Sequence, residues 1–332
     1  MVVLVEGQRS LSGKAHGLSK SRITAFEQCP KKLWLSVHRR DLAETHSESE
    51  LKFAAGHEVG TIACDLVPRG VMIEAQPDLK AALEQTTNLL AAGHKGPIYE
   101  ATFAHDGVLV QVDILEPFPE GGWKVAEVKS STGVKDYHLG DLATQVWVLE
   151  GCGIAIEAAA IRHIDTGFVL TEPGNYAGLL SDAPLLEAVR PIAEGRTDVA
   201  AKARETLEGD EPSVEVGAHC TKPFTCEFQA YCGKNLPQPP EWPIDILPRV
   251  GRRLADEMAQ EGIFDLRELS VDFLKKPQHR IVHQATVSGI PYHDPAGAMK
   301  ATQNWHFPRY YLDFETIALP VPAWIGTRPY QQ

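Results

Sequence analysis

Two carboxylates and a lysine are spaced so that they could bind a metal ion and cut a phosphodiester bond. Asp113 lies near the end of one apolar run, and Glu127 and Lys129 lie near the end of the next. Residues two apart on a strand share a face, and a hairpin partner can bring Asp113 beside them. Carboxylate oxygens suit Mg²⁺ or Mn²⁺, which activates a bound water and offsets charge on a phosphate. A lysine can orient that water. An isolated E-x-K tripeptide, by contrast, is more often an exposed ion pair.

The apolar patterns predict the elements that position these residues. Strands are expected at 98–104 and 108–115, joined by the Asp106-Gly107 pair that favours a tight hairpin turn. In chain order, the other expected elements are helices at 18–40 (capped by Ser19 or Ser21), 51–66 and 78–92, a strand at 123–128, a helix at 136–150, a strand at 154–164 with a short partner at 168–170, and a helical stretch at 181–208.

This order of a strand-borne Asp, a turn, a strand ending in Glu-Val-Lys and a helix containing Gln145 resembles the RecB-like family of PD-(D/E)XK nucleases. The resemblance implies an α/β (α+β) restriction-endonuclease-like core, a mixed sheet flanked by helices. It also implies that Gln145 and Tyr137 line the active site. The family carries a histidine ligand on an earlier helix, and Gly56-His57-Glu58 is the best match. A lone helical histidine is usually structural, so with the family match both interpretations of His57 stay open.

Four of the six cysteines are arranged as in the iron–sulfur branch of that family, which includes AddB and the CRISPR-adaptation nucleases. One is remote, Cys29 in a Cys-Pro pair, and three form a late cluster, Cys220, Cys226 and Cys232. The resemblance implies that these four hold a 4Fe–4S cluster that staples the domain. The first gap of the late cluster is longer than the branch commonly has, so a Cys₄ zinc site remains a rival. Cys64 and Cys152 are expected to be unliganded.

Charge and hydropathy narrow the function classes. The net charge of the 332 residues is −12, yet residues 1–40 hold eight Lys/Arg against two Glu, a local +6. Such a basic stripe suits a phosphate backbone, although on charge alone solvated helix faces are the favoured explanation. No apolar stretch is long enough to span a membrane, and no signal peptide is evident. We therefore expect a cytoplasmic protein without membrane contact.

Composition shifts predict the domain organisation. Residues 1–236 are expected to form the nuclease domain, and the proline-rich segment 237–243 a stiff linker. Residues 244–300 resemble a helix-hairpin-helix unit that could face DNA, and an ordinary small helical linker domain explains them equally well. In residues 301–332, a strand bearing Asp313 and Glu315 resembles the start of a DEDD exonuclease-like (RNase H-like) domain, and a chance Asp-x-Glu on a strand is an alternative of similar weight. The later motifs of that family have no room before Gln332, so this domain is expected to be truncated.

These features together predict a Mg²⁺- or Mn²⁺-dependent deoxyribonuclease that acts as an exonuclease on single-stranded DNA or duplex ends. One alternative is a catalytically inactive nucleic-acid-binding module with a structural Cys₄ metal site. Another is a zinc-stapled protein without a nucleic-acid role. The sequence leaves open the polarity of cleavage and the choice between endonuclease and exonuclease action.

Overall fold

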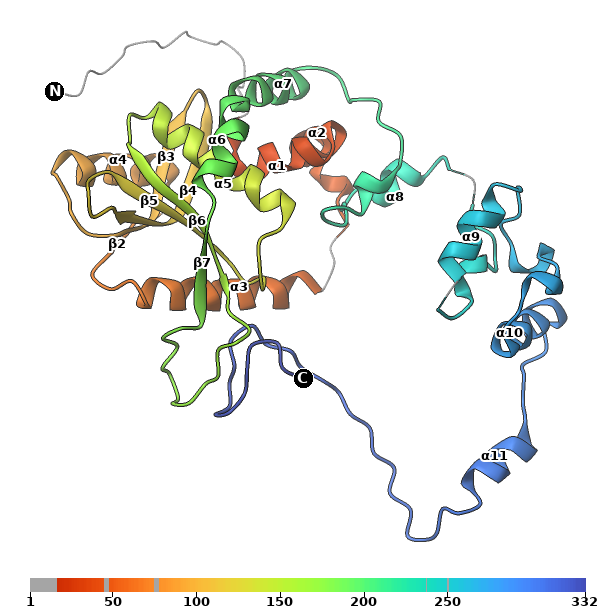
Figure 1. Cartoon of the computed structure of the whole chain (residues 1–332). Helices are drawn as coiled ribbons and strands as arrows, with labels where there is room; N and C mark the ends of the chain where they lie inside the picture. Colours follow the sequence, from red (N-terminus) through yellow and green to blue (C-terminus); the bar gives the residue numbers. More distant parts are fainter. Residues whose placement is uncertain (1–16, 45–47, 75–77, 237, 250) are drawn as a thin grey trace. The chain divides into compact units, whose positions relative to one another are not determined.

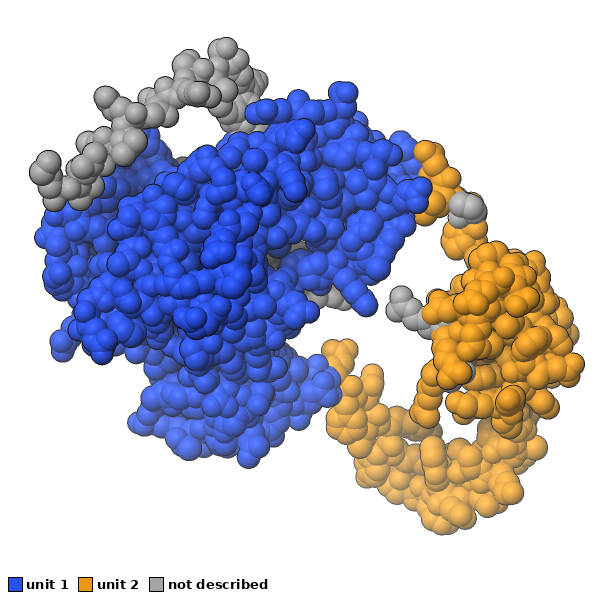
Figure 2. Space-filling view, turned by 45° about the horizontal axis from the view of Figure 1, so that its top comes forward, with its two compact units in different colours: residues 1–234, 316–332 blue, residues 235–315 orange. Residues whose placement is uncertain are grey.

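The computed structural model describes residues 17–44, 48–74, 78–236, 238–249 and 251–332. The chain divides into two compact units (Figure 2), one of residues 1–234 with 316–332 and the other of residues 235–315. The predicted boundary after residue 236 lies close to this division. The segment 301–332, expected to be one domain, is shared between the two units.

Within the described residues, the first unit is built on a seven-stranded mixed sheet in the order β2-β3-β4-β5-β6-β7, with β1 paired to β4 (Figure 1). The strands are β1 (Leu18–Ser19), β2 (Val71–Met72), β3 (Ile98–His105), β4 (Val108–Pro117), β5 (Trp123–Lys129), β6 (Ile156–Ile164) and β7 (Leu180–Pro184). Its helices are α1 (Lys20–Gln28), α2 (Pro30–His38), α3 (Glu48–Asp65), α4 (Leu79–Ala91), α5 (Asp136–Gly151), α6 (Leu186–Glu194), α7 (Arg196–Glu208) and α8 (Gln229–Gly233). The expected α/β class, a mixed sheet flanked by helices, is confirmed.

The hairpin between β3 and β4 forms where the sequence predicts it. Asp106 and Gly107 both adopt positive φ, 43° and 69°, the conformation that a tight primed turn requires. The two strands are antiparallel, and β4 pairs antiparallel with β5. The hairpin therefore determines which residue of β3 lies opposite which residue of β4.

Helices cover both faces of the sheet near the end of β5. Val125 packs in the main core with Leu142 and Val146 of α5. Ala126, the next residue along, packs instead with Ala63 of α3. Because side chains alternate along a strand, α5 and α3 lie on opposite faces of β5.

The helix expected at 18–40 is divided into α1 and α2. Ser19 caps α1, since its side chain accepts a hydrogen bond from the Arg22 N–H, and one of the two predicted caps is thereby confirmed. Cys29 ends the helix in an extended conformation, with φ −167° and ψ 120°. The residue before a proline avoids the helical region, and Pro30 then begins α2 at a position where it needs no N–H donor.

One expected strand pairing and one expected helix start are wrong. The strand β6 pairs with β7, not with residues 168–170. Leu170 instead exchanges backbone hydrogen bonds with the C-terminal segment, to Thr327 O (3.1 Å) and from Gly326 N (2.7 Å). The helical stretch expected from residue 181 accordingly begins only at Leu186. The five residues of β7 extend the sheet by a longer ladder than the short run at 168–170 could.

The second unit contains α9 (Gly251–Ala259), α10 (Pro277–Ser288) and α11 (Pro295–Thr302), with 3₁₀ turns between them. Ile244, Leu247, Leu266 and Leu274 form its small core. No strand forms over residues 308–317, contrary to expectation. A strand needs a partner for its backbone groups and a surface for its apolar face. The described residues offer neither, and the aromatic side chains of this run are largely exposed.

Candidate active site

The structure brings the three predicted catalytic residues together. The pairing of Ile114 with Ala126 places Asp113 opposite Glu127 when the ladder is continued by one residue. The Asp113 Oδ2 atom accepts a hydrogen bond from the Val128 N–H at 2.7 Å. The Lys129 ammonium lies 2.8 Å from Glu127 Oε1. The predicted proximity of the two carboxylates and the lysine is therefore met by the β4–β5 register.

Glu127 is the most enclosed of these groups, with only 2 % of the residue exposed. Its Oε1 accepts hydrogen bonds from Lys129 and from Lys20, the latter at 2.6 Å. Its Oε2 accepts one from the Gln145 amide. Burial alone would raise the pKa of Glu127, but the two ammonium groups outweigh burial and lower it. This carboxylate is therefore held in its charged form.

Asp113 shows the opposite shift. Burial, followed by the neighbouring charge of Glu127, raises the pKa of Asp113, while Lys20 and the Val128 N–H act against this rise. Two close carboxylates cannot both ionise easily, so one takes the charge and the other tends to keep its proton. A divalent cation would relieve this repulsion, which makes the pair suited to a metal.

Two residues that sequence reasoning missed complete the site. Lys20 enters from the first turn of α1 and contacts Glu127. Asp141 on α5 accepts a hydrogen bond from Thr24 at 2.7 Å and lies 3.4 Å from the Lys129 ammonium. Burial opposes the charge of Lys129, but Glu127 and Asp141 raise its pKa and keep it protonated. Asp141 lies one helical turn before Gln145, and this spacing was the available signal.

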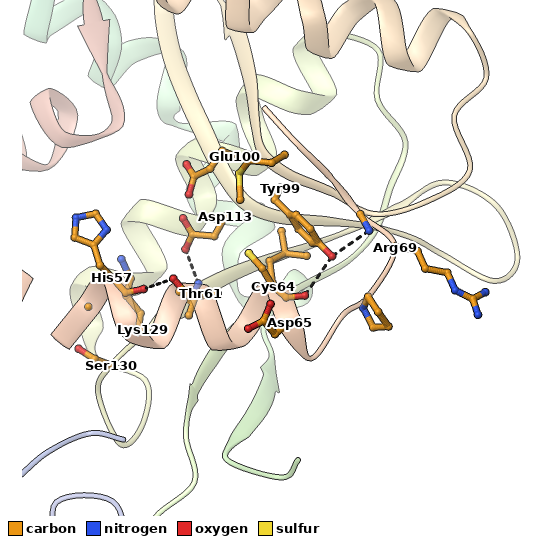
Figure 3. A pocket seen from close by; sticks show the side chains of 17 residues that line it. His57, Thr61, Cys64, Asp65, Arg69, Tyr99, Glu100, Asp113, Lys129 and Ser130 are labelled. Atoms are coloured by element: carbon orange, nitrogen blue, oxygen red, sulfur yellow. Dashed lines mark hydrogen bonds between the residues drawn. The ribbon is translucent and has the colours of Figure 1, made fainter. Parts of the chain in front are cut away.

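Asp113 and Lys129 also line a pocket of about 920 Å³. Figure 3 shows His57 of α3 and Glu100 of β3 among the side chains around it. Glu100 lies between the paired residues Tyr99 and Ala101 and adopts φ 54°, an uncommon value for a non-glycine residue. Burial raises the pKa of Glu100. The pocket thus gathers carboxylates and a histidine at the end of the central strands.

The other predicted site residues differ in their placement. His57 is exposed on α3 and lines the pocket together with Asp113 and Lys129, whereas Glu127 is not among the residues that line it. Gln145 is fully buried and contacts Glu127, and its Oε1 has no partner among the described residues. Tyr137 packs edge-on against Phe224, with ring centroids 4.7 Å apart, and is not among the residues that line the pocket.

The four predicted cysteine ligands line a single small pocket. Cys29, Cys220, Cys226 and Cys232 all border it. The Cys226 N–H donates to the Cys220 carbonyl at 2.8 Å. Burial raises the pKa of the Cys226 and Cys232 thiols. Cys64 lines the larger pocket, and the Cys152 thiol donates to the Ala104 carbonyl, so both lie apart from this set.

Among the residues that the structure describes, no group of three or more His, Cys, Asp or Glu side chains converges closely enough to hold a metal ion. The donor chemistry nevertheless fits what the resemblance implies, with carboxylate oxygens at one site and four thiols at the other.

Helix α1 connects the two sites. Lys20, Thr24 and Gln28 are spaced by four residues and therefore share one face of the helix. Lys20 contacts Glu127, and Thr24 contacts Asp141. Gln28 donates to the carbonyls of His219 and Phe224, at 2.8 and 2.7 Å, in the loop that carries the late cysteines. The position of α1 thus depends on the cysteine loop and determines where Lys20 lies.

Among the comparisons with known proteins, the family model matches only a short part of the chain. A family model described as "Domain of unknown function (DUF2779)" matches residues 310–332. No curated protein matches the chain. Among solved structures, one titled "Crystal structure of SSO0001" matches at 13 % identity and a TM-score of 0.31, covering 69 % of this chain and 90 % of that one. A likeness this weak carries no argument about function. No helix in the described residues has the length and apolar character needed to span a membrane.

Proposed function

We propose that this protein is a Mg²⁺- or Mn²⁺-dependent nuclease of the PD-(D/E)XK type that hydrolyses DNA, acting as an exonuclease on single-stranded ends. The observation that carries the proposal is the meeting of Asp113, Glu127 and Lys129 at the ends of neighbouring strands. Buried charges of both signs are costly unless they serve a purpose or are fully paired. A metal-dependent hydrolase gives each of them a purpose.

The proposed roles follow from the contacts. Asp113 and Glu127 would hold the cation, and His57 faces the same pocket as Asp113. A bound divalent ion would lower the pKa of a water molecule and offset charge on the phosphate. Lys129 would orient that water, and its pairing with Glu127 and Asp141 holds the ammonium in place.

The cysteine pocket supports a second part of the proposal. Four thiols from the first helices and the last loop of the unit border one small cavity. We propose that they hold a 4Fe–4S cluster. A zinc ion on the same four thiolates is the rival, and metal analysis distinguishes the two.

A cleavage assay tests the nuclease proposal. Protein purified without oxygen is incubated with end-labelled single-stranded and duplex DNA in the presence of Mn²⁺, with a chelator control. An exonuclease shortens linear single strands and leaves circular single strands intact. DNA binding without any cleavage would favour the inactive nucleic-acid-binding module instead.

Replacing Gln145 is expected to slow cleavage without abolishing it. The Gln145 amide donates to Glu127 and cannot itself replace a metal ligand. Loss of a group that orients a ligand typically costs about 10- to 100-fold in activity. We expect a decrease of that size in Gln145→Ala, measured as the rate at saturating Mn²⁺. Gln85→Ala makes the same change at an exposed helix position and should leave the rate unchanged. A Gln145→Ala rate equal to wild type would contradict this role.

Metal binding is expected to weaken below neutral pH. Burial and the charge of Glu127 raise the pKa of Asp113 to about 7. A raised pKa means that the proton remains on the carboxyl up to higher pH, and only the charged form binds a cation. Mn²⁺ affinity, measured without DNA, should therefore fall by about 10-fold for each pH unit below the raised pKa. Asp113→Asn should remove most of this pH dependence. Wild-type protein that binds Mn²⁺ equally well above and below neutral pH would refute the prediction.

A further inference from the structure

Lys20 pairs with Glu127, one of the two carboxylates proposed as metal ligands. Its ammonium lies 2.6 Å from Glu127 Oε1, and its side chain is only 22 % exposed. We propose that Lys20 is a positioning residue that competes with the metal for Glu127: it holds the carboxylate while the cation is absent and releases it when the cation binds. This inference rests on the proposed function.

The contacts of Glu127 explain why an exchange is required. Both oxygens of the carboxylate are engaged, Oε1 by two ammonium groups and Oε2 by an amide. A cation that approaches Glu127 must displace one of these donors. Lys129 is also paired with Asp141, whereas among the described residues Lys20 pairs with Glu127 alone. Displacing Lys20 breaks one ion pair and leaves Lys129 in place between its two carboxylates, so Lys20 is the donor that a cation displaces more easily.

The local structure allows Lys20 to move without disturbing the fold. Lys20 is the first residue of α1, and the Ser19 cap and the pairing of Leu18 with Val108 hold the start of the helix independently of it. A lysine side chain is a flexible four-carbon stem with a compact charge at its end. The ammonium can withdraw from Glu127 while the helix remains in place.

The balance of charge has a measurable consequence. Lys20 and Lys129 are the positive charges at this site, and they face the carboxyl groups of Glu127, Asp141 and Asp113, with Glu100 also near Lys20. Removing the charge of Lys20 eliminates both the competitor and its repulsion of the metal. Because Lys129 and Gln145 still hold Glu127, the carboxylate should stay in place. We expect the Mn²⁺ dissociation constant to fall by about 10-fold. This change corresponds to only a modest part of the Coulomb repulsion between an ammonium group and a cation bound to the same carboxylate.

The experiment compares Lys20→Gln, Lys20→Arg and Arg22→Met. Lys20→Gln keeps a neutral donor for Glu127, Lys20→Arg keeps the charge, and Arg22→Met removes a charge from the same helix at a residue that does not contact Glu127. Mn²⁺ binding is measured by electron paramagnetic resonance without DNA, and thermal unfolding confirms that each variant is folded. Tighter binding only in Lys20→Gln is the expected result.

Other outcomes overturn the proposal in distinguishable ways. If wild-type protein binds Mn²⁺ but Lys20→Gln binds it equally or more weakly, Lys20 does not compete, and the proposed nuclease function is unaffected. If Arg22→Met tightens Mn²⁺ binding as much as Lys20→Gln does, the effect comes from the lower net charge of the protein and not from competition for Glu127. If the wild-type protein binds no Mn²⁺ at all, the proposed function fails together with this inference. If Lys20→Gln does not fold, Lys20→Met and Lys20→Arg supply the same comparison.

Discussion

Cleavage of DNA is expected to be lost when any one of Asp113, Glu127 and Lys129 is replaced by alanine. Each change removes a metal ligand or the charge that faces the attacked phosphate, and we expect the rate at saturating Mn²⁺ to fall by about 1,000-fold or more. Glu127→Gln is the sharpest form of this test. It keeps the shape of the side chain and a possible contact with Lys129, but it removes the charge that would bind the cation.

Controls separate this effect from loss of the fold. Glu127 is buried between two lysines, so Glu127→Ala removes the carboxylate that pairs with Lys20 and one of the two that pair with Lys129, and it should also lower stability. Circular dichroism melting of each variant reveals such losses. Glu157→Ala, an acidic residue exposed on the neighbouring strand β6, should cleave like wild type. Wild-type rates in Glu127→Gln would sink the assignment of the active site.

Loss of one cysteine in the small pocket is expected to have the largest effect on stability. Cys29 and Cys220 are separated by 191 residues in the chain, yet they border the same pocket. A metal cluster on four thiolates closes this loop, and its binding energy becomes folding energy. Cys29→Ser, Cys220→Ser, Cys226→Ser and Cys232→Ser should each cost on the order of 5 kcal/mol or more of unfolding free energy, with reduced solubility.

The same proteins identify the metal. Wild-type protein purified without oxygen should be brown, with the broad visible absorbance of thiolate-bound iron, and each serine variant should lose that colour. Cys152→Ser is the matched control, since Cys152 is exposed and remote from the pocket. If the protein is colourless and contains one zinc ion per chain, the metal held by these four cysteines is zinc instead of iron. If the wild-type protein purified without oxygen contains neither iron nor zinc, and the serine variants melt at the same temperature as it does, there is no metal site at these cysteines.

The two sites are coupled through α1, which gives the cysteine variants a second expected consequence. Cys29 ends α1, and Lys20 begins it. Gln28 ties the C-terminal end of the helix to the loop of the late cysteines. When that loop loses its metal, α1 loses one of its anchors, so the contact between Lys20 and Glu127 should weaken with it. Cysteine variants that remain folded are therefore the place to look for altered Mn²⁺ affinity.

Local sequence signals were sufficient for the elements that carry the predicted residues. The Asp106-Gly107 pair predicts the hairpin because both positions need positive φ, and the structure has it there. Ser19 predicts the start of α1 because its side chain satisfies a free backbone N–H. The two-residue period of a strand predicts that Glu127 and Lys129 share a face. These features depend on neighbours in the chain, so they can be recognised without knowing the rest of the fold.

Tertiary structure alone decided which distant groups meet. No pattern in the sequence indicates that Lys20 reaches Glu127 across 107 residues, or that Thr24 meets Asp141. Helical periodicity identifies the face of a helix but not the strand it packs on. The same limit explains the strand expected at 308–317. Its residues have the composition of a strand, but a strand exists only where another backbone accepts its hydrogen bonds, and in the described chain none does.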